Sequence, residues 1–140
     1  MMSLNAPLLR ASFDLVIERD PELVKHFYDH LFKINPELAP MFHRRPREAQ
    51  EEMLAGALVA VLDHLDDAPW LVNQLGSLGE KHIGYGVTPA MYDAVGASLL
   101  ATLARAAGDD WNDELLEAWA DAYGAITDLM LAGTLARASA

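Results

Sequence analysis

Apolar residues recur at intervals of three and four along nearly the whole chain, which places them on one face of an α-helix. The segment after Gln50 shows this spacing most fully, at Met53, Leu54, Ala57, Leu58, Val61, Leu62 and Leu65. The sequence has no alternating run of β-branched residues and no Asn-Gly or Asp-Gly hairpin turn. This pattern predicts an all-α fold.

Prolines mark where the expected helices begin, because the missing N–H of proline costs nothing in a first helical turn. A capping side chain precedes several of them, as in Asp20-Pro21, Asn35-Pro36 and Thr88-Pro89. The marks predict about seven helices, two of them short. The expected core stripes include Leu9, Phe13, Val16 and Ile17 in the first helix, and Leu23, Phe27, Leu31 and Ile34 in the second. Unequal helices that meet at sharp corners favour packing at about 50° over a parallel-sided bundle.

Composition excludes several classes of protein. The chain has 140 residues, 52% of them hydrophobic, enough for one domain with a real core and no disulfides. The longest apolar run, Met53–Leu62, is shorter than the roughly 20 residues that span a bilayer. A net charge of −11 argues against nucleic acid and anionic membranes as partners. Without cysteine or a secretion signal, we expect a cytoplasmic protein.

One histidine stands out by its position. His82 ends an apolar stripe formed by Leu71, Leu75 and Leu78, and glycines follow it at Gly84 and Gly86. An imidazole in such a place is either a core histidine hydrogen-bonded to a backbone carbonyl or a metal ligand. The spacing alone does not separate the two interpretations.

Short motifs carry a resemblance to a known family. They are Phe27–Phe32, Asn35–Phe42, Gln50–Leu54, Lys81-His82 with Gly86-Val87, Met91–Gly96 and Ala118–Gly124. In order and spacing they resemble the globins, specifically bacterial single-domain haemoglobins and the globin domain of flavohaemoglobins. The resemblance runs from about Ala11 to Leu131 and implies one globin domain over residues 1–140, with seven to eight crossed helices around a haem pocket.

The resemblance also implies a cofactor, haem b, and the residues that hold it. His82 would be the proximal iron ligand, and the Leu78 carbonyl would fix its other ring nitrogen. The remaining residues expected to bind the haem are Phe42, Leu54, Lys81, Val87 and Tyr92. Tyr92 is also expected to act in catalysis from the proximal side.

On the opposite side of the haem, Tyr28 and Gln50 match the family's hydrogen-bond donors to bound O₂. The stretch between Phe42 and Gln50 is about two residues shorter than in the family. A slip in register would therefore put Ala49 or Glu51 in the pocket instead. The same stretch contains His43, a candidate sixth ligand. It also contains three arginines that either dock carboxylates such as haem propionates or form a solvated loop: Arg44, Arg45 and Arg47.

The first functional expectation is reversible binding of O₂, NO or CO, as in oxygen transport. The alternatives are an NO dioxygenase and a gas or redox sensor. The dioxygenase would need a separate reductase, since the chain ends at Ala140 without a dinucleotide fingerprint. Thr134 stands where flavohaemoglobins have a proximal glutamate, which puts strong oxidase activity in doubt. We expect a monomer or homodimer.

Two other polar clusters are candidate metal sites, and the first of them has no metal-site spacing with carboxylates elsewhere. His26, Asp29 and His30 lie on one helix and are expected to be partly exposed. His64 lies among three aspartates, and such a group is more often a solvated helix end than a cation site. Those aspartates are Asp63, Asp66 and Asp67.

Overall fold

The computed structural model describes residues 5–42, 46–84 and 88–139, with the backbone alone at residues 80, 82–84 and 132–139. These residues form six α-helices and two 3-10 helices: α1 (Ala6–Arg19), α2 (Leu23–Ile34), η1 (Pro36–Phe42), α3 (Arg47–Asp63), α4 (Ala68–Gly84), α5 (Pro89–Ala107), η2 (Gly108–Asp110) and α6 (Asp113–Ser139). The described ranges contain no strand. The all-α prediction is therefore confirmed.

Local side chains account for where several helices begin and end. The Asn5 carboxamide accepts the Leu8 amide at 3.2 Å at the start of α1. The Asn112 carboxamide accepts the Leu115 amide at 2.9 Å at the start of α6. These caps satisfy amides that have no partner within the helix. Gly108 ends α5 with a φ of 57°, which glycine adopts at little cost.

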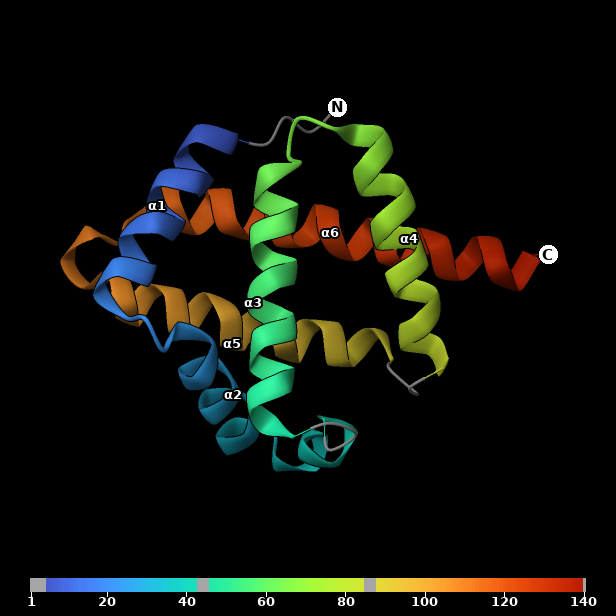
Figure 1. The fold of residues 1–140 in the computed structure, drawn as a ribbon, viewed down its shortest axis with the longest axis horizontal. Helices are drawn as coiled ribbons and strands as arrows, with labels where there is room; N and C mark the ends of the chain where they lie inside the picture. Colours follow the sequence, from blue (N-terminus) through green and yellow to red (C-terminus); the bar gives the residue numbers. More distant parts are fainter. Residues whose placement is uncertain (1–4, 43–45, 85–87, 140) are drawn as a thin grey trace.

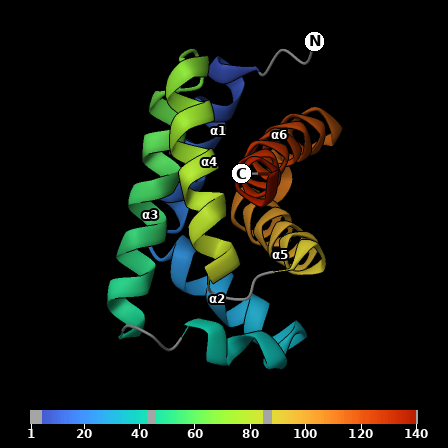
Figure 2. The same cartoon turned by 90° about the vertical axis from the view of Figure 1, so that its right-hand side faces the viewer.

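The helices form two crossed layers. Figures 1 and 2 show α3 and α4 in one layer and α5 and α6 in the other, with the helices of one layer crossing those of the other. The helix α4 packs on α6, and α2 packs on α5 and η1. This arrangement agrees with the crossed packing that the uneven helix lengths predict. No helix in the part of the chain described is long and apolar enough to cross a membrane.

The expected core stripes are mostly, but not wholly, correct. Leu9, Phe13 and Val16 are buried, and the Phe13 ring lies 6.3 Å from that of Trp119. Three residues of the expected stripes are exposed instead: Ile34 is 60% exposed, Met53 is 44% exposed, and Ala57 is also exposed. Ile34 is the last residue of α2, where the chain turns away into η1. On α2 the buried face is completed by Tyr28.

A glycine lets α4 lie directly against the backbone of α6. A Cβ atom added at Gly79 would lie 2.0 Å from the carbonyl oxygen of Met130. No side chain larger than hydrogen fits there without a shift of one helix. Gly79 therefore sets how closely α4, the helix that contains His82, approaches α6.

Candidate functional site

Tyr28 and Gln50 form a hydrogen bond between α2 and α3. The Gln50 amide nitrogen donates to the Tyr28 hydroxyl oxygen at 3.2 Å, and Tyr28 is 2% exposed. Burial raises the pKa of the Tyr28 phenol, and the hydrogen bond from Gln50 partly offsets this. The phenol is therefore neutral at pH 7. Because its oxygen accepts from Gln50, its own proton remains available to a third group.

Aromatic and apolar side chains surround the Tyr28 ring. Phe32 stacks on it at 5.7 Å, and Phe42 meets it edge-on at 5.5 Å between ring centroids. Three partly buried side chains pack against the same cluster: Leu54, Met91 and Val95. A single polar pair in apolar surroundings is typical of a small-molecule site, where few polar groups give orientation.

The structure bears on the register question after Phe42. Of the residues at positions 49 to 51, Gln50 is the one that forms the hydrogen bond with Tyr28. Glu51 instead accepts a hydrogen bond from the Arg47 side chain at 2.9 Å. The structure therefore brings Gln50 to Tyr28, and the role of either residue beside a haem remains a prediction. His43 lies outside the described residues.

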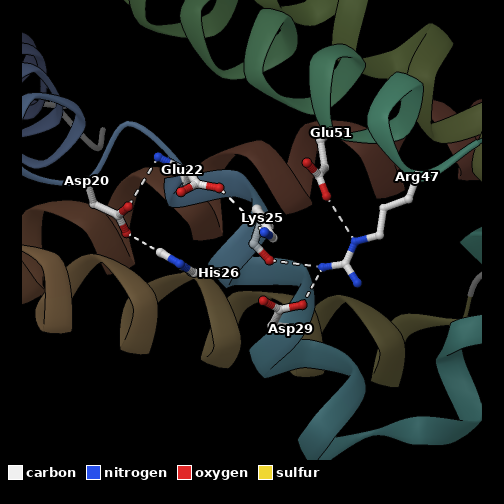
Figure 3. A network of polar contacts seen from close by, with 7 residues as sticks. All are labelled: Asp20, Glu22, Lys25, His26, Asp29, Arg47 and Glu51. Carbon is white, nitrogen blue, oxygen red and sulfur yellow. Dashed lines mark hydrogen bonds and ion pairs between the residues drawn. The ribbon is translucent and has the colours of Figure 1, made fainter.

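Arg47, expected to dock an external carboxylate or to be solvated, contacts other residues of the chain. Figure 3 shows its guanidinium between α2 and α3. It donates to the Asp29 carboxylate at 2.6 Å, to the Lys25 carbonyl at 3.0 Å and to Glu51. These contacts give no support to the expectation that Arg47 binds an external carboxylate. Arg44 and Arg45 lie outside the described residues, so for them that expectation stays a prediction.

The opposite wall of the expected pocket is described in part. His82 lies on the α4 backbone near the end of that helix, but its side chain is outside the described residues. The same holds for the side chain of Thr134, and Val87 is outside them altogether. Lys81 is exposed, and Leu78 is partly buried one turn before His82. The proximal roles of these residues remain predictions.

Tyr92 is buried where α4, α5 and α6 meet. It is 8% exposed and packs with Leu71, Leu75 and Met130. Burial raises its pKa. The Tyr123 hydroxyl donates to the Tyr92 carbonyl at 2.5 Å, and burial raises the pKa of Tyr123 to about 12. Sequence reasoning missed Tyr123, because a tyrosine on an expected helix gives no signal of a contact 31 residues away.

The histidines outside this site have ordinary partners. His26 contacts the Asp20 carboxylate at 2.6 Å, also visible in Figure 3, and His30 contacts the Ser98 hydroxyl at 2.9 Å. His64 stacks on Trp70 with ring centroids 3.8 Å apart. Among the residues with described side chains, no group of three or more His, Asp or Glu could hold a metal ion.

The fold is an all-α arrangement of crossed helices, and Tyr28 and Gln50 form a part-buried hydrogen-bonded pair among apolar side chains. Comparison with known families then identifies it. The family model for the globins matches residues 25–130. The chain belongs to the globin family.

The relatives and solved structures similar to the chain support this assignment. A flavohemoprotein of Bordetella pertussis is 34% identical over 126 residues, and one of Chromobacterium violaceum is 32% identical over the same length. Each alignment covers 89% of this chain and 31% of the relative, so the chain spans about a third of their length. A bacterial globin structure from Campylobacter jejuni has a TM-score of 0.79 at 21% identity, with 96% and 97% of the two chains covered.

A second structural neighbour is a longer chain. A flavohemoglobin from Malassezia yamatoensis, described with bound FAD and heme, has a TM-score of 0.72 at 24% identity. The match covers 91% of this chain and 35% of that one. At this identity the neighbours support the fold alone.

Proposed function

We propose that this chain binds haem b through His82 and reversibly binds O₂ or another diatomic gas beside Tyr28 and Gln50. The observation that carries the proposal is the part-buried hydrogen bond between Tyr28 and Gln50, in a chain of the globin family. This pair joins α2 and α3, and its two residues are the ones to which the family resemblance assigns gas binding. The pair therefore gives the assignment a geometric basis beyond the motif.

The residues present fit a haem. A porphyrin needs apolar contacts along its faces, and Phe42, Leu54 and Val95 supply partly buried apolar surface in one cluster. His82 on α4 would ligate the iron, and Tyr92 and Leu78 would line the same side. When bound, the haem supplies an iron centre that binds a diatomic gas.

The chain's own groups would control how firmly the gas is held. A diatomic ligand with partial negative charge accepts a hydrogen bond from the Tyr28 hydroxyl, whose raised pKa keeps its proton in place. Gln50 donates to the same oxygen and so orients the phenol. The surrounding Phe32, Phe42 and Leu54 keep competing water away. A hydrogen bond in such surroundings is stronger than in water.

A second candidate function is NO dioxygenation supported by a reductase. The flavohemoproteins that are 34% identical to this chain favour it. The electrons would come from a reductase, and the Tyr28–Gln50 pair would hold the O₂ that reacts with NO. Thr134, at the position of the family's proximal glutamate, argues for binding over rapid turnover.

Optical absorption spectra of the purified protein test the proposal. We expect a Soret band that shifts when CO is added to the reduced form, and loss of stable haem binding in His82→Ala. The absence of a Soret band after addition of hemin would refute haem binding. A Soret band of normal position and intensity in His82→Ala would refute its role as ligand.

Tyr28→Phe tests the gas site itself. Removing one hydrogen bond worth about 1–3 kcal/mol should accelerate O₂ dissociation roughly 5- to 160-fold. Stopped-flow displacement of O₂ by CO measures this rate. Gln50→Leu should have a smaller effect in the same direction, because its amide acts through Tyr28. An unchanged rate in Tyr28→Phe would remove Tyr28 from the site.

Nitrate formation with a supplied flavin reductase then separates dioxygenation from simple binding.

A further inference from the structure

The half of α3 that contains Gln50 is not held by a buried apolar core. Leu62, near the far end, is the one buried residue of this helix, all of whose residues are described. Leu54 and Leu58 are partly buried, and Met53 is exposed. In this half of α3, Leu54 packs on the cluster around Tyr28 while no residue is fully buried, so polar contacts also contribute to holding these turns on α2.

Arg47 adds further polar contacts between these turns and α2 to the Gln50–Tyr28 hydrogen bond. Its guanidinium donates to Asp29 and to the Lys25 carbonyl on α2, and to Glu51 on its own helix (Figure 3). It also lies 5.8 Å from the centroid of the Phe32 ring. One planar group therefore contacts two carboxylates, a carbonyl and an aromatic ring, a geometry that arginine allows and lysine does not.

These contacts run beside the Tyr28–Gln50 hydrogen bond. Asp29 is the residue after Tyr28, and Glu51 is the residue after Gln50. Phe32, which the guanidinium approaches, stacks on the Tyr28 ring. The ionic bridge and the hydrogen bond therefore join the same turns of the same two helices.

We propose that Arg47 is a positioning residue that holds the first turns of α3 against α2 and thereby keeps the Gln50 amide on the Tyr28 hydroxyl. This inference rests on the proposed function, because it assigns Arg47 an effect on bound gas. Arg47 itself contacts neither Tyr28 nor the ligand. Its influence passes through Asp29 and Glu51 to the pair.

The chain offers a matched control at the other end of α3. Arg10 of α1 donates to the Leu62 carbonyl at 2.9 Å and to the Asp63 carboxylate at 2.7 Å. Arg10 thus ties the end of α3 to α1 as Arg47 ties its start to α2, each through one carbonyl and one carboxylate of the neighbouring helix. The side chain of Arg10 is 50% exposed and that of Arg47 is 44% exposed, so both should be replaceable without loss of the fold.

The first experiment compares O₂ dissociation in the haem-loaded wild type, Arg47→Leu, Arg47→Lys and Arg10→Leu at low and high salt. We expect a rate about 3- to 10-fold higher in Arg47→Leu, and an intermediate rate in Arg47→Lys. Raising NaCl to about 1 M should accelerate the wild type and leave Arg47→Leu unchanged, because salt screens exposed ion pairs. Arg10→Leu should keep the wild-type rate and salt response. Equal effects of the Arg47→Leu and Arg10→Leu substitutions would overturn the proposal.

The second experiment does not depend on gas binding. Hydrogen exchange of the backbone over residues 47–54 should be faster in Arg47→Leu than in wild type and unchanged there in Arg10→Leu. Unchanged exchange in Arg47→Leu would overturn the positioning role. If Tyr28→Phe leaves O₂ dissociation unchanged while exchange responds as expected, the proposed gas site fails and the positioning role stands.

Discussion

The contact between α4 and α6 yields a quantitative prediction for Gly79→Ala. The added Cβ would lie 2.0 Å from the Met130 carbonyl oxygen, and its next nearest atoms are also Met130 backbone. An ordinary contact needs about 3.4 Å, so the helices must separate by about 1.4 Å at this point. No side-chain rotation relieves the clash, because the opposing atoms are backbone.

The expected cost follows from two opposing effects. Overpacking a fitted contact costs about 1–3 kcal/mol, and a clash between backbone atoms belongs at the upper end of this range. Replacing a helical glycine by alanine contributes about 0.5–1 kcal/mol in the other direction. We therefore expect Gly79→Ala to lower the free energy of unfolding by about 2 kcal/mol. In a domain of this size, that loss lowers Tm by roughly 4–10 °C.

Gly56→Ala is the matched control. Gly56 is an exposed residue in the middle of α3, and a Cβ there would meet nothing within 4 Å. It should gain about 0.5–1 kcal/mol from helix propensity alone. Urea unfolding followed by circular dichroism measures both variants in the same haem state. If Gly79→Ala is stabilised as much as Gly56→Ala, the close approach of α4 to α6 is wrong.

Two further predictions concern buried hydroxyl groups. Ser12→Ala leaves the buried Trp119 indole N–H without its 2.9 Å acceptor and should lower the free energy of unfolding by about 1–3 kcal/mol. Urea unfolding measures this loss. Because one hydrogen bond contributes roughly 1 kcal/mol, a loss below about 0.5 kcal/mol would contradict the prediction. The pKa of Tyr123 rises from 10.0 to about 12 on folding, so between these pH values the unfolded state binds fewer protons and stability falls as pH rises. Tyr123→Phe should remove roughly 2–3 kcal/mol of that fall, measured by unfolding at pH 9 and pH 12; an unchanged slope would refute the raised pKa.

The sequence predicted the helices well because their signals are local. Period and capping residues identify a helix without knowledge of its neighbours, and Leu9, Phe13 and Val16 are buried as expected. The errors are Ile34, Met53 and Ala57, which are exposed, because apolar spacing alone does not show which part of a helix face a neighbouring element covers. The sequence did not single out Gly79, because a lone glycine in a helix reads only as a weak helix former. Its importance comes from the α6 backbone that lies against it, which the sequence does not show.

The site shows the same division between residue type and residue partner. The motifs selected Tyr28 and Gln50, but whether their side chains meet depends on how α2 and α3 cross. The Arg47–Glu51 pair has the i,i+4 spacing of a helical ion pair and could have been read from the sequence. The contact of Arg47 with Asp29, 18 residues earlier, could not, because several carboxylates lie within reach of a long side chain until the crossing is known. Contacts between helices therefore decide whether Tyr28 and Gln50 form a site. Removing the Arg47 side chain tests most directly whether the contact between α2 and α3 holds these two residues together.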